Sequence, residues 1–277
     1  MRRVKTLVGV AAAIVAVAGV GLCAFCSPED GLERARTLLK RAREAIGGEE
    51  AIRRVRLLVI KGTMTAGFDA VTGQPLSRPH TVELRIAPPD RYLQIEREPL
   101  LTRQSGFSGD VLLNSVTSTG DMRSGGHFPV DRVMKIERMR FAQLALGILA
   151  DLATVFPLTP MPSNNAVRAS SVRVSGPDAF FGILDLDEGS GAPASLRFRS
   201  DLVFPRPITR EERLAGIVPP LPAAEPTDIV MSFEDRRDVG GLRLPFRIRR
   251  TARGMTFEDI RVERVSVNPP LGFLEKR

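Results

Sequence analysis

The chain has 277 residues, with 40 basic and 32 acidic side chains and therefore a net charge of +8. It contains one tyrosine and no tryptophan, so stacking platforms for single-stranded nucleic acid are poorly supplied, and its basic residues are scattered rather than clustered. We therefore expect no nucleic-acid partner, and an anionic membrane surface fits the diffuse positive charge better.

The N-terminus has the pattern of an export signal. Arg2, Arg3 and Lys5 precede residues 7–26, which contain no charged side chain. The length of this run lies between the ~7–15 apolar residues of a signal peptide and the ~20 residues of a membrane span. Three interpretations of residues 1–29 stay open: a cleaved signal peptide, an uncleaved membrane anchor, or a lipoprotein modified at Cys23.

All three interpretations place residues 30–277 outside the cytoplasm, either in the periplasm or anchored to a membrane and facing the periplasm. Both cysteines, Cys23 and Cys26, lie in the targeting segment, so the exported domain has no disulfide. Its stability must come from a hydrophobic core, which about 250 residues can supply.

Two helices are expected before the first strand. In residues 31–46 apolar side chains recur at intervals of three and four, and the pair Gly47 and Gly48 then ends the helix. A shorter helix is expected from residue 49 to about residue 55.

Alternation of apolar and polar residues predicts strands for most of the remaining chain. Val82, Leu84 and Ile86 share one face of the clearest strand, and prolines end it. The last strand changes parity near Glu263, which predicts a one-residue bulge there. The expected strands, about eleven in all, cover residues 56–65, 80–87, 91–97, 101–108, 111–116, 166–175, 178–187, 194–204, 228–238, 242–251 and 255–267.

Residues 130–155 interrupt the strand pattern. Asp131 can cap a helix whose residues from Phe141 to Phe156 are apolar on nearly every side. A helix of this kind is buried on most sides. It is too short and too interrupted to be expected to span a bilayer.

Three stretches of the sequence resemble exported bacterial proteins. The first is residues 42–56, which contain Gly-Gly-Glu-Glu; the second is Pro88-Pro-Asp-Arg-Tyr92. The third is the C-terminal hairpin series, with Gly241-Leu-Arg-Leu-Pro-Phe-Arg-Ile-Arg-Arg250 and Val267-Asn-Pro-Pro-Leu271. The three stretches occur in the same order as in the LolA/LolB-like superfamily of outer-membrane lipoprotein-sorting proteins. The chain therefore resembles a remote member of that superfamily.

The resemblance implies a half barrel of eleven strands with helices over it and an acyl-chain cavity between them. The predicted fold class is therefore α+β: a large curved antiparallel sheet, an incomplete barrel, with helices packed on its concave face. The motifs concern turns and strand boundaries, so they indicate a fold more than an activity.

Residues with catalytic potential are few. His80 begins a strand and His127 lies in a glycine-rich loop, and neither has a partner at metal-ligand spacing. Residues 185–189 contain three acids, but the full oxygen-ligand loop of a calcium site is missing. We expect no metal, no cofactor and no catalytic residue; a hydrolase assembled around the two histidines is the enzymatic alternative.

Two binding functions remain. In the first, a lipid or the acyl chain of an acylated protein occupies a cavity between sheet and helices. In the second, the core is filled and the protein is a scaffold that binds another envelope protein through its outer face or through the proline-rich loop 205–226. The predicted cavity lining is Leu84, Ile86, Leu93, Phe141, Leu144, Ile148, Phe181, Leu196, Phe198, Phe246 and Ile248.

Overall fold

The computed structural model describes residues 28–66, 78–118, 130–151, 159–161, 170–175, 181–200 and 227–270. In these residues it has three helices, α1 (Pro28–Ile46), α2 (Glu49–Arg53) and α3 (Val130–Leu149), and twelve strands. The strands are β1 (Leu58–Ala66), β2 (His80–Ala87), β3 (Arg91–Glu98), β4 (Leu101–Ser108), β5 (Val111–Ser118), β6 (Thr159–Met161), β7 (Ser171–Ser175), β8 (Phe181–Leu186), β9 (Pro193–Ser200), β10 (Thr227–Val239), β11 (Leu242–Ala252) and β12 (Met255–Val267).

All twelve strands belong to one antiparallel sheet with the order β5-β4-β3-β2-β1-β12-β11-β10-β9-β8-β7-β6. The first strand of the chain pairs with the last, so β1 and β12 join two series of consecutive hairpins at the middle of the sheet. Among the described strands β5 and β6 are the edges, and no pairing joins them. The predicted α+β fold with an incomplete antiparallel barrel is therefore confirmed. The strand that the prediction did not include is β6, which has three residues.

The bulge predicted near Glu263 is present in the pairing of β1 with β12. Lys61 pairs with Arg264 and the next residue, Gly62, pairs with Val262, so Glu263 has no partner on β1. Because the extra residue changes the parity of the strand, Ile260, Val262 and Val265 can all be buried.

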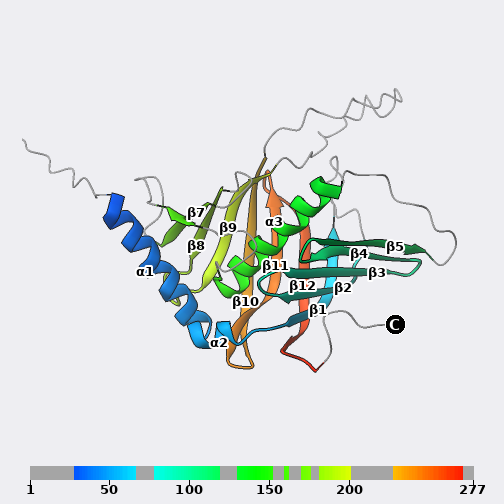
Figure 1. Ribbon diagram of the computed structural model, residues 1–277, viewed down its shortest axis with the longest axis horizontal. Helices are drawn as coiled ribbons and strands as arrows, with labels where there is room; N and C mark the ends of the chain where they lie inside the picture. The colour runs from blue at the N-terminus through cyan, green and yellow to red at the C-terminus, as the bar shows by residue number, and fades with distance from the viewer. Residues whose placement is uncertain are drawn as a thin grey trace, which may run out of the picture.

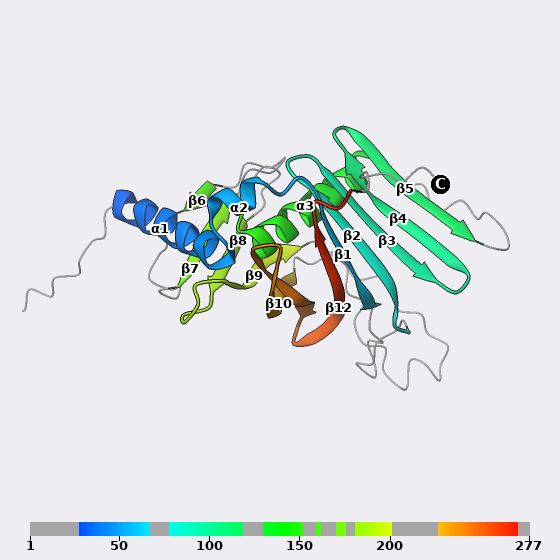
Figure 2. The same ribbon diagram turned by 90° about the horizontal axis from the view of Figure 1, so that it is seen from below.

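Helix α3 lies across the face of the sheet, and the strands curve around it (Figures 1 and 2). It contacts β3, β4 and β5 in one arm of the sheet and β9 and β11 in the other. Every residue from Phe141 to Ala150 is buried, as the apolar run predicts. The helix ends at Leu149, because Ala150 has a left-handed backbone with φ 48°. The residues from 152 to 155 that were predicted to continue it lie outside the described residues.

Helix α3 and strand β10 approach each other closely at Gly147. A Cβ atom on this residue would lie 1.7 Å from Cζ of Phe233, a ring that is itself buried. A glycine inside a helix normally costs ~1 kcal/mol relative to alanine. Here it allows the helix backbone to rest directly on an aromatic ring.

Helix α1 packs beside β6 and β7 at the other end of the same core (Figure 1). Its buried face, which includes Ala35, Leu39 and Ala42, belongs to the same hydrophobic cluster as α3. The guanidinium of Arg43 donates from Nε to the carbonyl oxygen of Ala150 over 3.1 Å, so α1 satisfies one of the free carbonyls at the end of α3. Both helices therefore cover the concave side of the sheet.

We expect Gly147→Ala to destabilise the protein by ~1–3 kcal/mol, the usual result of overpacking a rigid core. On an exposed helix the same change would stabilise by ~1 kcal/mol. Chemical denaturation monitored by circular dichroism measures the difference. In a double variant with Phe233→Leu the loss should be smaller than the sum of the two single losses. Additive losses would show that α3 does not rest on Phe233.

Candidate functional site

Most of the side chains that were predicted to line a cavity lie in the main core. Nine of them are 0–9% exposed and belong to the hydrophobic cluster that the sheet shares with α1 and α3. The nine are Leu84, Ile86, Phe141, Leu144, Ile148, Leu196, Phe198, Phe246 and Ile248.

The other two side chains have different surroundings. Leu93 belongs to a second, smaller cluster with Leu57, Val59, Ala87 and Ile95. Strand β3 instead directs Tyr92 toward α3, where its ring lies 6.3 Å from that of Phe141. Phe181 is 60% exposed.

Aromatic rings fill the concave face at Phe141, where the fully buried part of α3 begins. The rings of Phe107 and Phe141 meet edge to face at 5.7 Å, and Tyr92 packs beside them. All three rings are fully buried. Aromatic pairs of this geometry stabilise a core beyond the area that they bury.

A buried polar cluster, which the sequence analysis missed, connects the middle of α3 to the sheet. Arg140 donates to Glu258 over 2.6 Å, and Arg250, which is paired with Glu258 across β11 and β12, lies 3.6 Å from the same carboxylate. Arg250 also donates to Oε1 of Gln143 over 3.1 Å. Two cations of the sheet and helix therefore share one carboxylate, and we call these four residues together with Glu137 the α3 polar cluster.

The pKa values of the two acids in the α3 polar cluster are shifted in opposite directions. Burial by itself would raise the pKa of Glu258, but the charges of Arg140 and Arg250 outweigh it and hold that pKa below its usual value. Burial raises the pKa of Glu137, and the same two arginines offset only part of the rise. Oε2 of Glu137 is buried without a hydrogen-bond partner.

His80 lies at the margin of this region. Its Nδ1 is 3.1 Å from the carbonyl oxygen of Arg78, and its Nε2 is 3.4 Å from Glu96. Both contacts hold the buried ring in place. The other histidine, His127, lies outside the described residues, as does the loop 205–226. Among the described residues there is no group of three or more His, Cys, Asp or Glu side chains that could hold a metal ion.

An open pocket of ≈ 520 Å³ lies at the other arm of the sheet, on β7, β8, β9 and β10. The register places seven of its lining residues in two rows on the outer face, away from α3. One row runs across four strands and the other across three. The first row is Arg173, Ile183, Arg197 and Val230, and the second is Phe181, Arg199 and Asp228.

The remaining lining residues form the row between these two. They are Val174, Gly182, Phe198 and Ile229, and the side chains of Val174, Phe198 and Ile229 are buried toward the core. Of the predicted cavity residues, the pocket therefore includes Phe181 and Phe198. The alternation in β7 to β10 could have revealed the outer-face rows from the sequence, but not that they enclose a space.

The pocket combines apolar and cationic side chains. Phe181, Ile183 and Val230 supply its apolar lining on the outer face. Asp185 fixes Arg197 by two hydrogen bonds of 2.8 Å, and Asp228 accepts from Arg199 over 3.0 Å. Small-molecule sites have volumes of ~300–1,000 Å³ and are mostly apolar with a few polar groups, and this pocket fits that description.

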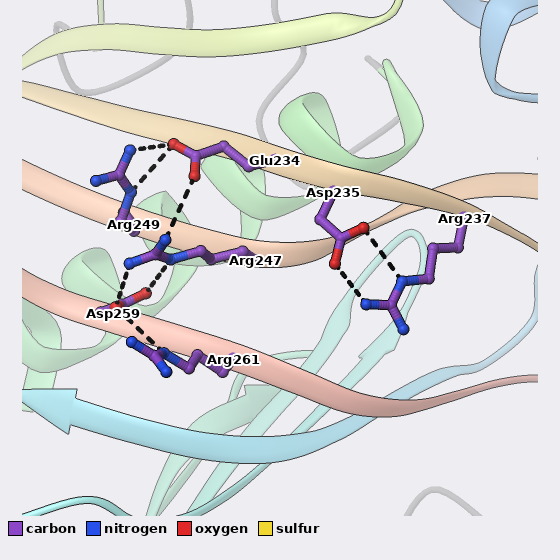
Figure 3. Close-up of polar contacts among 7 residues, drawn as sticks. All are labelled: Glu234, Asp235, Arg237, Arg247, Arg249, Asp259 and Arg261. Carbon is purple, nitrogen blue, oxygen red and sulfur yellow. Dashed lines mark hydrogen bonds and ion pairs between the residues drawn. The ribbon is translucent and has the colours of Figure 1, made fainter.

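The outer face continues from the pocket into a ladder of ion pairs across β10, β11 and β12 (Figure 3). Glu234 pairs with both Arg249 and Arg247, the latter at 3.9 Å. Asp259 pairs with Arg247 at 2.8 Å and with Arg261 at 3.8 Å. Because these pairs are partly exposed, each contributes little to stability. Three arginines against two carboxylates leave the ladder with a net positive charge.

Comparison with solved structures gives remote likenesses. A LolA superfamily protein from Nitrosomonas europaea has a TM-score of 0.46 and 10% identity, over 85% of this chain and 94% of that one. A domain assigned to outer membrane lipoprotein sorting from Vibrio parahaemolyticus has a TM-score of 0.42 and 10% identity, over 89% and 95%. A DUF1329 family protein from Desulfovibrio piger has a TM-score of 0.38 and 8% identity, over 88% and 95%.

These likenesses concern the fold, and two of the three structures bear the names of the superfamily that the sequence motifs resemble. No protein-family model and no curated protein sequence matches the chain. In the part of the chain that the structure describes, no helix is long and apolar enough to cross a membrane.

The α3 polar cluster should make the free energy of unfolding depend on pH. We expect Glu258→Gln to lower the free energy of unfolding at pH 7 by ~3–5 kcal/mol, because two buried guanidinium groups lose their counter-charge. Since the folded pKa of Glu258 is depressed, the loss should be complete above the unfolded pKa of ~4.3 and should shrink as the pH falls through the folded value. Urea unfolding at several pH values measures it.

The matched variant Glu137→Gln should behave in the opposite way. Its folded pKa is raised, so the wild-type protein is favoured below the unfolded pKa of ~4.3 and loses that stabilisation as the pH rises through the folded value. We expect the variant to equal the wild type near pH 4 and to be the more stable protein at pH 7. A difference independent of pH for either variant would contradict the assignment.

Proposed function

We propose that the protein binds a lipid, or the acyl chain of an acylated protein, without catalysing a reaction. The observation that carries the proposal is the open pocket on β7–β10, which the exposed ring of Phe181 lines together with Ile183 and Val230. An exposed aromatic side chain in a concave site loses contact with water when an apolar chain binds, and this burial favours binding.

The outer-face pocket is the better site than the space beneath α3. The side chains that face α3, among them Phe141, Leu144 and Ile148, are already buried against the sheet. Gly147 touches Phe233 so closely that a ligand between them would have to displace the helix. The outer pocket takes a ligand without moving α3.

The proposed location of the protein follows from its sequence. Residues 1–29 serve as a signal peptide or as an N-terminal membrane anchor, and residues 30–277 form the exported domain in the periplasm or at a membrane that faces it. The net positive outer face, including the ion-pair ladder, favours an approach to anionic membrane surfaces.

The absence of catalysis is part of the proposal. His80 contacts a backbone carbonyl and Glu96, and neither contact places a serine, threonine or cysteine nucleophile beside the ring. A hydrolase would need a nucleophile, a base and an orienting group within hydrogen-bond reach. Alanine in place of both His80 and His127 should leave ligand binding unchanged.

A filled scaffold is the second candidate, and the packed concave face favours it. In that case the protein would bind another envelope protein through the same outer face and would carry no lipid. Native mass spectrometry and lipid extraction of protein purified from the cell envelope distinguish the two, because a carrier should retain a lipid.

We expect Ile183→Trp to abolish lipid retention, because the larger side chain fills the pocket from the middle of the outer row. Thr251→Trp is the matched control: Thr251 pairs with Val230 on the same face but does not line the pocket. Circular dichroism should show both variants folded. If Ile183→Trp retains as much lipid as the wild type, the pocket is not the binding site. If the wild-type protein itself carries no lipid, the scaffold function is the one that remains.

A further inference from the structure

Two of the three arginines that line the pocket have a carboxylate partner within the protein. Asp185 accepts two hydrogen bonds from Arg197 and one each from the hydroxyls of Ser171 and Ser195, at 2.6 and 3.0 Å. This carboxylate therefore fixes the guanidinium of Arg197 as part of the sheet. Arg199 has Asp228 as its partner.

Arg173 is the exception in the pocket. It lines the pocket and is half-buried, and among the described residues it has no carboxylate within ion-pair distance and no side-chain hydrogen bond. A guanidinium has five N–H donors that require acceptors. Because Arg173 is only half-buried, water can satisfy these donors in the free protein and a ligand in the pocket can replace that water.

Arg236, another half-buried arginine, shows how this fold treats such a group when its role is structural. Arg236 also lacks a carboxylate partner among the described residues, and burial lowers its pKa to about 10. Its guanidinium donates to the carbonyl oxygens of Arg243, Gly147 and Pro193 over 3.0, 3.0 and 2.6 Å. These bonds join β10 and β11 to the last turns of α3 and to β9. Arg173 has no corresponding set of carbonyls in the described part of the chain.

We propose that Arg173 is an anion subsite, and that the ligand of the outer-face pocket is an amphiphile with an acidic head, a carboxylate or a phosphate. This inference rests on the proposed function and names the class of ligand. Arg173 pairs with Ile183, and Ile183 pairs with Arg197 on the next strand. The head binds at Arg173, and the apolar chain lies along Ile183, Val230 and Phe181.

Arg197 adds positive charge beside this subsite without binding the head itself. The two arginines flank Ile183 in one cross-strand row, so their Cα atoms are ~10 Å apart, two inter-strand distances. Asp185 already accepts two hydrogen bonds from Arg197, so the donors that can bind the anion are those of Arg173. The planar guanidinium binds two oxygens of a carboxylate or phosphate at once, which a lysine cannot do.

Isothermal titration calorimetry with three single-chain probes tests the inference. Dodecanoate, dodecyl phosphate and dodecanol share one chain and differ in the head, and all are used below the concentration at which they form micelles. We expect the two acids to bind the wild type more tightly than the alcohol. Arg173→Gln should weaken the binding of the acids roughly tenfold to a hundredfold, as expected for loss of a charge-assisted hydrogen bond, and leave dodecanol unchanged.

Arg261→Gln is the control for charge alone, because Arg261 is on the same face but outside the pocket. This variant should bind all three probes as the wild type does. Arg173→Lys keeps the charge without the planar fork, and it should retain part of the affinity for the acids. Arg173→Gln should unfold at the same urea concentration as the wild type, within ~0.5 kcal/mol, since no described partner is lost.

The outcomes separate this inference from the proposed function. Equal binding of dodecanol and the two acids to the wild type, or acid binding that Arg173→Gln does not weaken, would overturn the anion subsite and leave lipid binding intact. Failure of all three probes to bind would overturn the proposed function itself. A loss confined to dodecyl phosphate would assign the head as a phosphate, and a loss confined to dodecanoate would assign it as a carboxylate.

Discussion

The last turns of α3 lose contact with water on every side, and the rest of the fold is arranged around that burial. A helix that is apolar all round cannot rest on a flat sheet, because one sheet face covers one side of it. Strands β3 to β5 cover α3 on one side and β9 and β11 on the other, so the sheet must curve. Gly147 and Phe233 show how closely helix and sheet meet. Removing α3 would expose the inner faces of both arms, which explains why one core includes residues of β1 to β4 and of β7 to β12.

The polar side chains in the middle of α3 impose a second constraint. Glu137, Arg140 and Gln143 succeed one another at intervals of three, so they form one stripe along the helix. This stripe faces Arg250 and Glu258 on the sheet. Buried ion pairs contribute weakly to stability because desolvation offsets their attraction. Their geometry is specific, however, so a shift of α3 along the sheet would leave charges buried without partners. The apolar side chains of α3 therefore supply the stability, and its polar stripe determines its position on the sheet.

Periodicity in the sequence predicted the strands, the helices and even the bulge at Glu263, because each of these depends on the order of apolar and polar residues alone. The α3 polar cluster was not predictable, since its members come from α3, β11 and β12 and meet only after folding. Leu93 illustrates the limit of assigning sheet faces by hydrophobicity. In β3 the residues that face α3 are Tyr92, Gln94 and Glu96, and the more apolar Leu93 and Ile95 face the other way.

Phe181 shows the same limit at the other arm. Alternation along β8 places Phe181 and Gly182 on opposite faces of the sheet. It does not say which of the two faces is buried, because that depends on the neighbouring strands. The inner row contains Val174 and Phe198, which pair with Gly182 from either side, so Phe181 is left on the outer face. Burial of the inner row against the core fixes the register of β7 to β10, and that register aligns the outer rows. The pocket thus depends on the core for its shape, while its occupation does not require the core to open.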